Sequence, residues 1–67
     1  MSNSKERFSL ETRLSNGITV CLYMDVYGIN YVITAFDKSY RVLKTRKTSD
    51  YNYAMHTMVI YQNMFSK

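Results

Sequence analysis

The chain has 67 residues, with nine Lys or Arg against five Asp or Glu, a net charge of +4, one His and one Cys. A chain of this length forms one small domain and is too short for most enzymes. One Cys excludes an intramolecular disulfide, and one His with one Cys excludes a four-ligand zinc site without carboxylates and a partner chain.

The beginning of the chain carries no recognisable targeting signal. Residues 1–6 are polar and charged, and neither the apolar core of a signal peptide nor a run of about 18 apolar residues that would span a membrane is found. We expect residues 1–6 to form a flexible tail and residues 7–67 to form a single domain. We also expect a protein of the reducing cytoplasm with no membrane contact.

The first part of the chain predicts two strands joined by a tight turn. Apolar and polar residues alternate over 8–14 and over 18–26, and residues 15–17 (Ser-Asn-Gly) separate the two runs. A two-residue turn would set charged residues opposite core positions, whereas a three-residue loop opposes Leu14 to Ile18 and keeps apolar residues on one face. We therefore predict the three-residue loop, with its glycine in a left-handed, bulged position.

The middle of the chain predicts two further strands. The first covers residues 31–36 and is apolar on both faces, and a tight turn at 37–39 leads to a fourth strand at 40–46. Val42 and Leu43 are adjacent and cannot face the same side of a sheet. One of them must therefore pack elsewhere or lie on a bulge.

The last part of the chain predicts one helix. The sequence Thr48-Ser49-Asp50 is typical of a helix start, with a hydroxyl to cap the helix and a carboxylate near its positive end, and the helix should run from about Asp50 to about Phe65. The stripe expected to cover the sheet is Tyr51, Ala54, Met55, Met58, Val59, Tyr61 and Phe65. The predicted fold is α+β: a four-stranded antiparallel β-meander followed by one C-terminal helix packed on one face, ββββα in two layers.

The predicted helix carries more apolar surface than one sheet can cover. It has no charged residue between Asp50 and Lys67. Beyond the core stripe, a second mostly apolar line consists of Tyr53, Thr57, Ile60 and Met64. We interpret this line as an interface with another copy, which would make the chain a homo-oligomer, or with a partner protein. Scattered surface hydrophobes, or the N-terminal tail folding over the helix, are the alternatives.

Positive charge is concentrated in the second half of the chain, where six basic residues and one acidic residue follow residue 37. The candidate contact residues are the basic side chains of the fourth strand and its turn, with the neighbouring tyrosine: Lys38, Tyr40, Arg41, Lys44, Arg46 and Lys47. Cations that bind phosphate and rings that stack on bases are the usual components of nucleic-acid contact. The same charges protect an edge strand from aggregation, or bind an acidic protein surface.

The residue types that carry chemistry are few and dispersed. His56 lies on the polar strip of the predicted helix, and Cys21 lies on the strand face opposite the core residues. The five acidic residues form no pair at the spacing that acid–base catalysis or metal binding requires. We predict no catalytic, cofactor-binding or metal-binding residue, no small-molecule substrate, and a protein that is not an enzyme.

Two resemblances extend this interpretation. Residues 18–65, in which three strands precede TSDYNYAMHTMVIYQNMF, resemble the layout of AP2-type and integrase amino-terminal DNA-binding domains, where the sheet reads the major groove and the helix supports it. The whole chain, rich in Tyr, Asn, Lys and Met, resembles the small phage and mobile-element proteins that disable host defences, anti-CRISPR proteins included. This second resemblance implies stoichiometric binding that occludes a nuclease or its nucleic-acid channel within a nucleoprotein complex in the host cell.

These observations together predict a non-catalytic binding protein that obstructs a macromolecular partner, and a phage-type inhibitor of a host nuclease or defence complex is the leading hypothesis. A small DNA- or RNA-binding accessory protein that uses the basic last strand is the first alternative. A homodimeric structural or regulatory subunit is the second. Since the net charge is positive, an inhibitor of this kind is not expected to imitate DNA phosphates.

Overall fold

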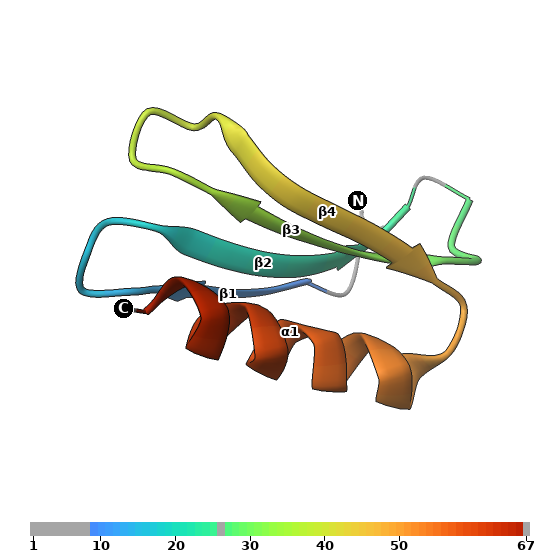
Figure 1. Cartoon of the computed structure of the whole chain (residues 1–67). Coiled ribbons are helices and arrows are strands. Elements are labelled where there is room, and N and C mark those ends of the chain that lie inside the picture. The colour runs from blue at the N-terminus through green and yellow to red at the C-terminus, as the bar shows by residue number, and fades with distance from the viewer. Residues whose placement is uncertain (1–8, 26, 67) are drawn as a thin grey trace.

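The computed structural model describes residues 9–25 and 27–66 (Figure 1). Its elements are the strands β1 (Ser9–Arg13), β2 (Thr19–Met24), β3 (Tyr31–Phe36) and β4 (Val42–Thr48) and the helix α1 (Tyr51–Phe65). The strands form one antiparallel sheet in the order β1-β2-β3-β4, and α1 packs on one face of it. The predicted α+β fold is confirmed. The predicted tail at residues 1–6 lies outside the described residues.

The β1–β2 turn has the predicted three-residue loop. The amide of Leu14 donates to the carbonyl of Ile18 at 2.7 Å, and the amide of Gly17 donates to the carbonyl of Leu14 at 3.0 Å. Gly17 has a φ of 92°, a left-handed value that glycine adopts without steric cost. The resulting register opposes Leu10 to Leu22, so the apolar residues of both strands share one face.

The β3–β4 pair contains the predicted irregularity. Ala35 pairs with Lys44 and Phe36 pairs with Val42, so Leu43 is the extra residue of a bulge. Pairing continues to Thr48, which lies opposite Tyr31. The strand therefore covers 42–48 instead of the predicted 40–46. It starts later because Tyr40 belongs to the turn, and it ends later because the partner strand offers pairing positions along its whole length.

The start of α1 differs from the prediction in its capping group. The helix begins at Tyr51, and Asp50 is the N-cap, whose carboxylate accepts a hydrogen bond from the amide of Tyr53 at 3.2 Å. The Thr48 hydroxyl accepts from the amide of Asp50 at 3.1 Å. The predicted hydroxyl cap is thus wrong, because the hydroxyl shapes the turn into the helix while the carboxylate caps it.

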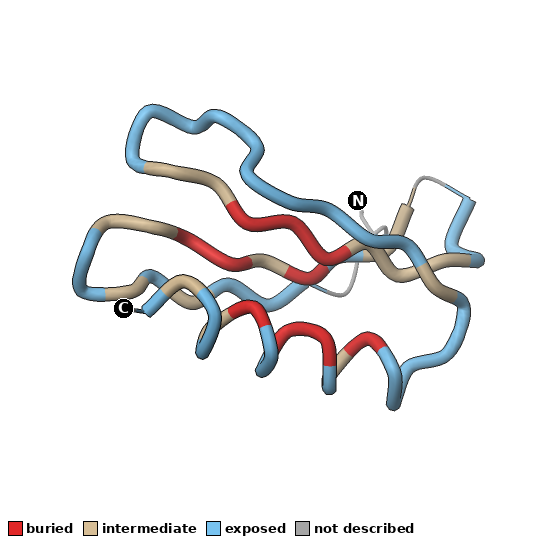
Figure 2. The backbone as a smooth tube through the Cα atoms, viewed as in Figure 1, coloured by how far each residue is buried: buried red, intermediate tan, exposed pale blue. Residues whose placement is uncertain are grey.

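The core lies between α1 and the central strands, shown in red in Figure 2: Val20, Leu22, Ile33 and Ala35 from the sheet, and Ala54, Met58 and Tyr61 from the helix. The predicted helix stripe is wrong at three positions, because Tyr51 and Val59 are exposed whereas Thr57 is only 4% exposed. The helix lies over β2 and β3 and borders β4, so Val59 has no strand beneath it. No helix in the described residues is long and apolar enough to cross a membrane.

Candidate interaction surface

β4 is an edge strand of the sheet and carries most of the predicted contact residues. Its only sheet neighbour among the described residues is β3, and six of its seven residues are exposed, as the pale blue tube in Figure 2 shows. The sequence VLKTRKT contains three basic residues and no acidic one. Such charges prevent an edge strand from pairing with another copy of itself. Its exposed side chains are also free to contact a partner.

The register of β4 divides its basic side chains between the two faces of the sheet. Lys44 lies opposite Ala35 and Arg46 opposite Ile33, both of which are core residues. Directly opposed residues share a face, so Lys44 and Arg46 lie on the face that α1 covers. Lys47 lies opposite Val32 and is on the other face. The predicted basic set is therefore not one continuous patch, because a strand turns successive side chains to opposite sides.

Arg46 joins the edge strand to the helix. Its Nη1 donates to the hydroxyl of Tyr53 at 3.1 Å. The pKa of the guanidinium is raised, first by the nearby Tyr61 hydroxyl and then by Tyr53, because oxygen atoms close to a cation stabilise it. Of these two hydroxyls, only that of Tyr53 accepts a hydrogen bond from Arg46. The hydrogen bond to Tyr53 holds the charged side chain of Arg46 beside α1. This contact brings together residues that the sequence analysis had assigned to separate sets.

The exposed line of the helix starts beside β4 at Tyr53 and contains three of its four predicted members. Tyr53, Ile60 and Met64 recur at helical spacing on one side of α1, and all are exposed. Thr57 belongs to the same line by spacing, but it is buried, and its hydroxyl donates to the carbonyl of Tyr53 at 2.8 Å. Its prediction as an exposed interface residue is wrong, because this back-bond satisfies the hydroxyl and lets the small side chain pack against the sheet.

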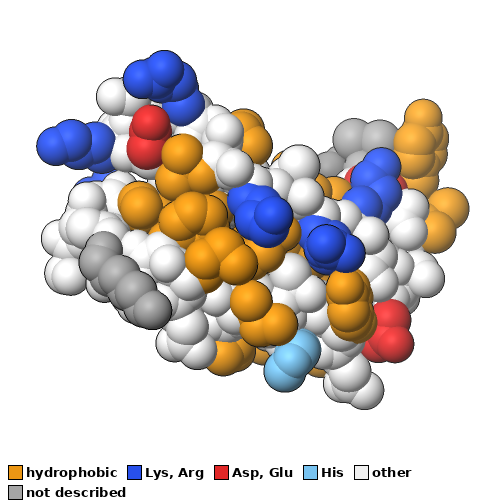
Figure 3. Space-filling model, viewed as in Figure 1, with side chains coloured by type: hydrophobic (Ala, Val, Ile, Leu, Met, Phe, Trp, Pro, Cys, Tyr) orange, Lys and Arg blue, Asp and Glu red, His pale blue; other side chains and the backbone are white. Residues whose placement is uncertain are grey.

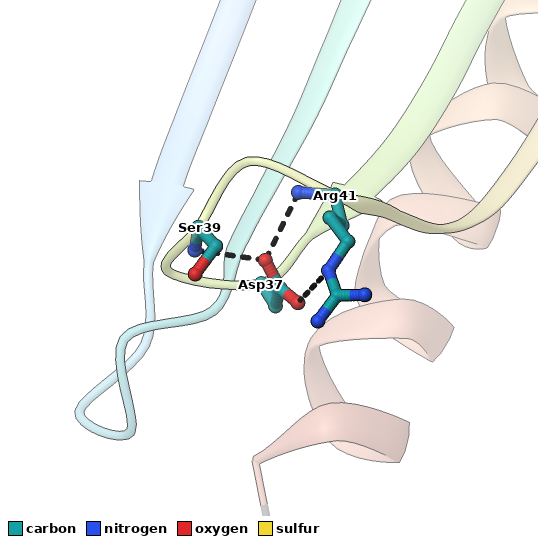
Figure 4. A network of polar contacts seen from close by, with 3 residues as sticks. All are labelled: Asp37, Ser39 and Arg41. Atoms are coloured by element: carbon teal, nitrogen blue, oxygen red, sulfur yellow. Dashed lines mark hydrogen bonds and ion pairs between the residues drawn. The ribbon is translucent and has the colours of Figure 1, made fainter.

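The β3–β4 turn is held by the carboxylate of Asp37 (Figure 4). Its Oδ1 accepts hydrogen bonds from the amides of Ser39 at 2.8 Å and Arg41 at 2.9 Å, and its Oδ2 lies 3.7 Å from Nε of Arg41. The amide of Arg41 is the main cause that lowers the pKa of the Asp37 carboxyl, and the Ser39 amide and the Arg41 charge add to it. The turn therefore presents its basic side chains from a fixed backbone.

Tyr40 occupies the position of this turn that glycine favours. Its φ is 66°, the one positive φ at a non-glycine residue in the described part of the chain. The amide of Tyr40 donates to the carbonyl of Asp37, as the amide of Gly17 donates to the carbonyl of Leu14 in the β1–β2 turn. The two turns are thus alike, yet one has glycine and the other an aromatic residue that is 74% exposed. A left-handed tyrosine costs about 1 kcal/mol or more, and its exposed ring returns little of this through packing.

Hydrophobic and basic side chains together form one surface over β4 and α1. Figure 3 shows hydrophobic side chains gathered over both elements, with Lys and Arg side chains among them. We call this the β4–α1 surface and define it by its exposed residues: Leu43, Lys44, Arg46, Tyr53, Ile60 and Met64. Val42 lies opposite Phe36, on the face of the sheet away from α1. Lys38, Tyr40 and Arg41 extend it at the β3–β4 turn.

The apolar residues of β4 were not among the predicted contact residues. Val42 is 58% exposed, and Leu43 is exposed at the bulge. The adjacency of two apolar residues indicated an irregularity in this strand, but it did not show that both side chains would lie outside the core. The β2–β3 turn also exposes Tyr27 and Ile29, at the end of the sheet where Lys47 lies opposite Val32.

The residues with potential chemistry lie apart from one another. Cys21 is half-buried on the sheet face away from α1. Burial and the charge of Glu11 raise the pKa of its thiol, and a hydrogen bond from the Thr34 amide offsets part of this rise. His56 is exposed on α1. In the described residues, no three of His, Cys, Asp and Glu lie close enough together to hold a metal ion.

Comparisons with known proteins assign no family to the chain. No protein-family model matches it, and searches of curated proteins and of solved structures find no similar protein. The functional interpretation therefore depends on the β4–α1 surface.

Proposed function

We propose that this chain is a non-catalytic binding protein that obstructs a macromolecular partner through the β4–α1 surface. A phage-type inhibitor of a host nuclease or defence complex, acting in the cytoplasm, is the form of this function that the sequence resemblance favours. The observation that carries the proposal is the union of an exposed basic edge strand with an exposed apolar line of the helix. Mixed surfaces of this kind combine steering by charge with burial of apolar area.

Two details support a role in binding. The exposed line of α1 consists of tyrosine, isoleucine and methionine, and aromatic residues and methionine are enriched at protein interfaces. Tyr40 sits in a strained left-handed position with its ring in solvent. Strained positions of this kind cluster at functional sites.

The proposal is tested by titrating the protein into a panel of nucleases, RNA-guided enzymes included. The experiment is run at several concentrations of nuclease and of nucleic-acid substrate. If the protein binds the nuclease, full inhibition is reached at molar equivalence, and the end point follows the nuclease concentration. If the end point follows the substrate concentration instead, the protein coats nucleic acid and the accessory-protein function replaces the inhibitor. Absence of inhibition across the panel contradicts the proposal.

Matched variants locate the surface. Lys44→Glu and Ile60→Glu change two exposed residues of the β4–α1 surface and should weaken inhibition. Arg13→Glu and Val59→Glu are the controls, because Arg13 lies on the opposite edge strand and Val59 is exposed on α1 away from the surface. Equal effects of a surface variant and its control would exclude the β4–α1 surface as the site.

A further inference from the structure

The outer edge of β4 offers backbone hydrogen-bonding groups as well as side chains. In the described residues, β3 is its only sheet neighbour, and no turn or cap contributes a backbone hydrogen bond to it. Alternate N–H and C=O groups of an edge strand point away from the sheet, and an extended peptide pairs with such groups by adding a strand. Figure 1 shows β4 along this edge of the sheet, with its end near the start of α1.

The charges of β4 select the kind of strand that this edge accepts. A second copy pairing through β4 would bring Lys44, Arg46 and Lys47 of both chains together, and directly opposed like charges destabilise a strand pair. An acidic strand instead places carboxylates opposite these cations, so that the contacts become attractive. The opposite edge strand, β1, carries one residue of each sign, Glu11 and Arg13, and has no such preference.

We propose that β4 is the docking edge for an extended acidic segment of a partner protein, which adds to the sheet as a fifth strand. Its carboxylates pair with Lys44 and Arg46 on the helix side. The apolar residues that alternate with these carboxylates lie on the other face of the sheet, beside Val42 and the aliphatic stem of Lys47. This inference rests on the proposed function and names the chemistry of its partner.

The distribution of the cations favours a peptide over a nucleic acid. The side chains of an added strand alternate between the two faces of the sheet, and the basic residues of β4 are divided between the same two faces. A phosphate backbone would be followed by cations along one side, whereas the sheet separates Lys47 from Lys44 and Arg46. The apolar members Val42 and Leu43 also match the side chains of a peptide better than they match phosphates.

The test uses the full chain and labelled model peptides slightly longer than the seven residues of β4. In the first peptide Glu alternates with Val, in the second Glu alternates with Pro, and in the third Lys alternates with Val. Binding is followed by fluorescence anisotropy, and backbone hydrogen exchange locates the site. We expect the Glu–Val peptide to bind and to slow exchange in β4. The Glu–Pro peptide should bind more weakly, because proline cannot donate to the strand pair.

Variants of the protein test the role of charge. Lys44→Glu should weaken binding of the Glu–Val peptide about tenfold and strengthen binding of the Lys–Val peptide. Arg13→Glu makes the same change in net charge on the other edge strand and should alter the affinity less than about threefold. A circular dichroism spectrum and melting curve unchanged by either substitution show that the fold is intact.

Four results would overturn the inference. Equal affinity for the Glu–Pro peptide would mean attraction by charge without strand addition. Slowed hydrogen exchange in β1 instead of β4 would show that β1 is the docking edge. If a single-stranded RNA of equal charge binds more tightly than the Glu–Val peptide, and Lys44→Glu weakens that binding, the partner is a nucleic acid. If none of the peptides binds while nuclease inhibition remains sensitive to Lys44→Glu, this inference fails and the proposed function stands.

Discussion

Replacing Tyr40 with glycine separates the free-energy cost of its left-handed backbone from the contribution of its side chain to binding. A left-handed conformation costs an L-residue about 1–2 kcal/mol, and a glycine costs about 0.5–1 kcal/mol more to order on folding. The Tyr40 ring is 74% exposed, so its removal forfeits little packing. Tyr40→Gly should therefore raise the free energy of unfolding by about 0.5–1 kcal/mol, or the melting temperature by roughly 3–6 °C for a domain of this size. Urea and thermal unfolding followed by circular dichroism measure both quantities.

Two further variants make this measurement interpretable. Gly28 has a φ of 69° and open space around the position of an added Cβ, so Gly28→Ala reports the cost of a left-handed side chain in this chain, about 1 kcal/mol. Tyr40→Ala keeps the backbone cost, removes the ring, and should leave stability within about 0.5 kcal/mol while weakening partner binding. If Tyr40→Gly lowers stability, the ring packs in a way that outweighs the strain, and the argument that Tyr40 serves binding is wrong.

Three other measurements test particular contacts. Hydrogen bonds and the Arg41 charge lower the pKa of the Asp37 carboxyl. The contribution of Asp37 to stability is therefore complete above the unfolded pKa of about 3.9 and is lost as the pH falls through the lower folded value. Asp37→Asn should reduce the difference between the urea midpoints at pH 7 and pH 3, and an unchanged difference would contradict this. If the helix line mediates self-association, light scattering should give twice the mass of the 7.9 kDa chain for the native protein and a monomer for Ile60→Glu, whereas a monomeric native protein would remove this prediction. Ile33→Ala removes a fully buried core side chain and should cost about 2–5 kcal/mol; a urea midpoint close to that of the native chain would show that the core is less tightly packed than described.

The sheet could be predicted from the sequence because the patterns that specify its strands and turns lie within short segments of the chain. Alternation with a period of two set the strand faces, and opposing apolar residues across the β1–β2 turn chose between two loop lengths. The glycine at position 17 agreed with that choice. The bulge could be expected from Val42 and Leu43, since no regular strand places two neighbours on one face.

The position of the helix over the sheet could not be predicted in the same way. Apolar residues surround most of α1, so its sequence does not mark one side as the core side. The structure turns Thr57 toward the sheet and leaves Val59 exposed, with the helix lying over β2 and β3. The same placement brings Arg46 to Tyr53, a contact between elements that no pattern within either of them specifies. Tyr40 was expected at a contact surface, but its left-handed backbone depends on the exact turn geometry.

The order of pairing in the sheet has a consequence for how the chain folds. Each strand pairs with the strand before it in sequence, so every hairpin closes a short loop and costs little entropy. The helix instead makes the most distant contacts in the chain: the Asn16 side chain donates to the Phe65 carbonyl at 2.6 Å, and Gln62 reaches Thr12 at 3.5 Å. The sheet is thus able to assemble first, with its apolar face open until the fifteen residues of α1 dock. A chain cut before α1 would keep its hairpins but present that face to any other chain, and aggregation instead of simple loss of stability would be its fate.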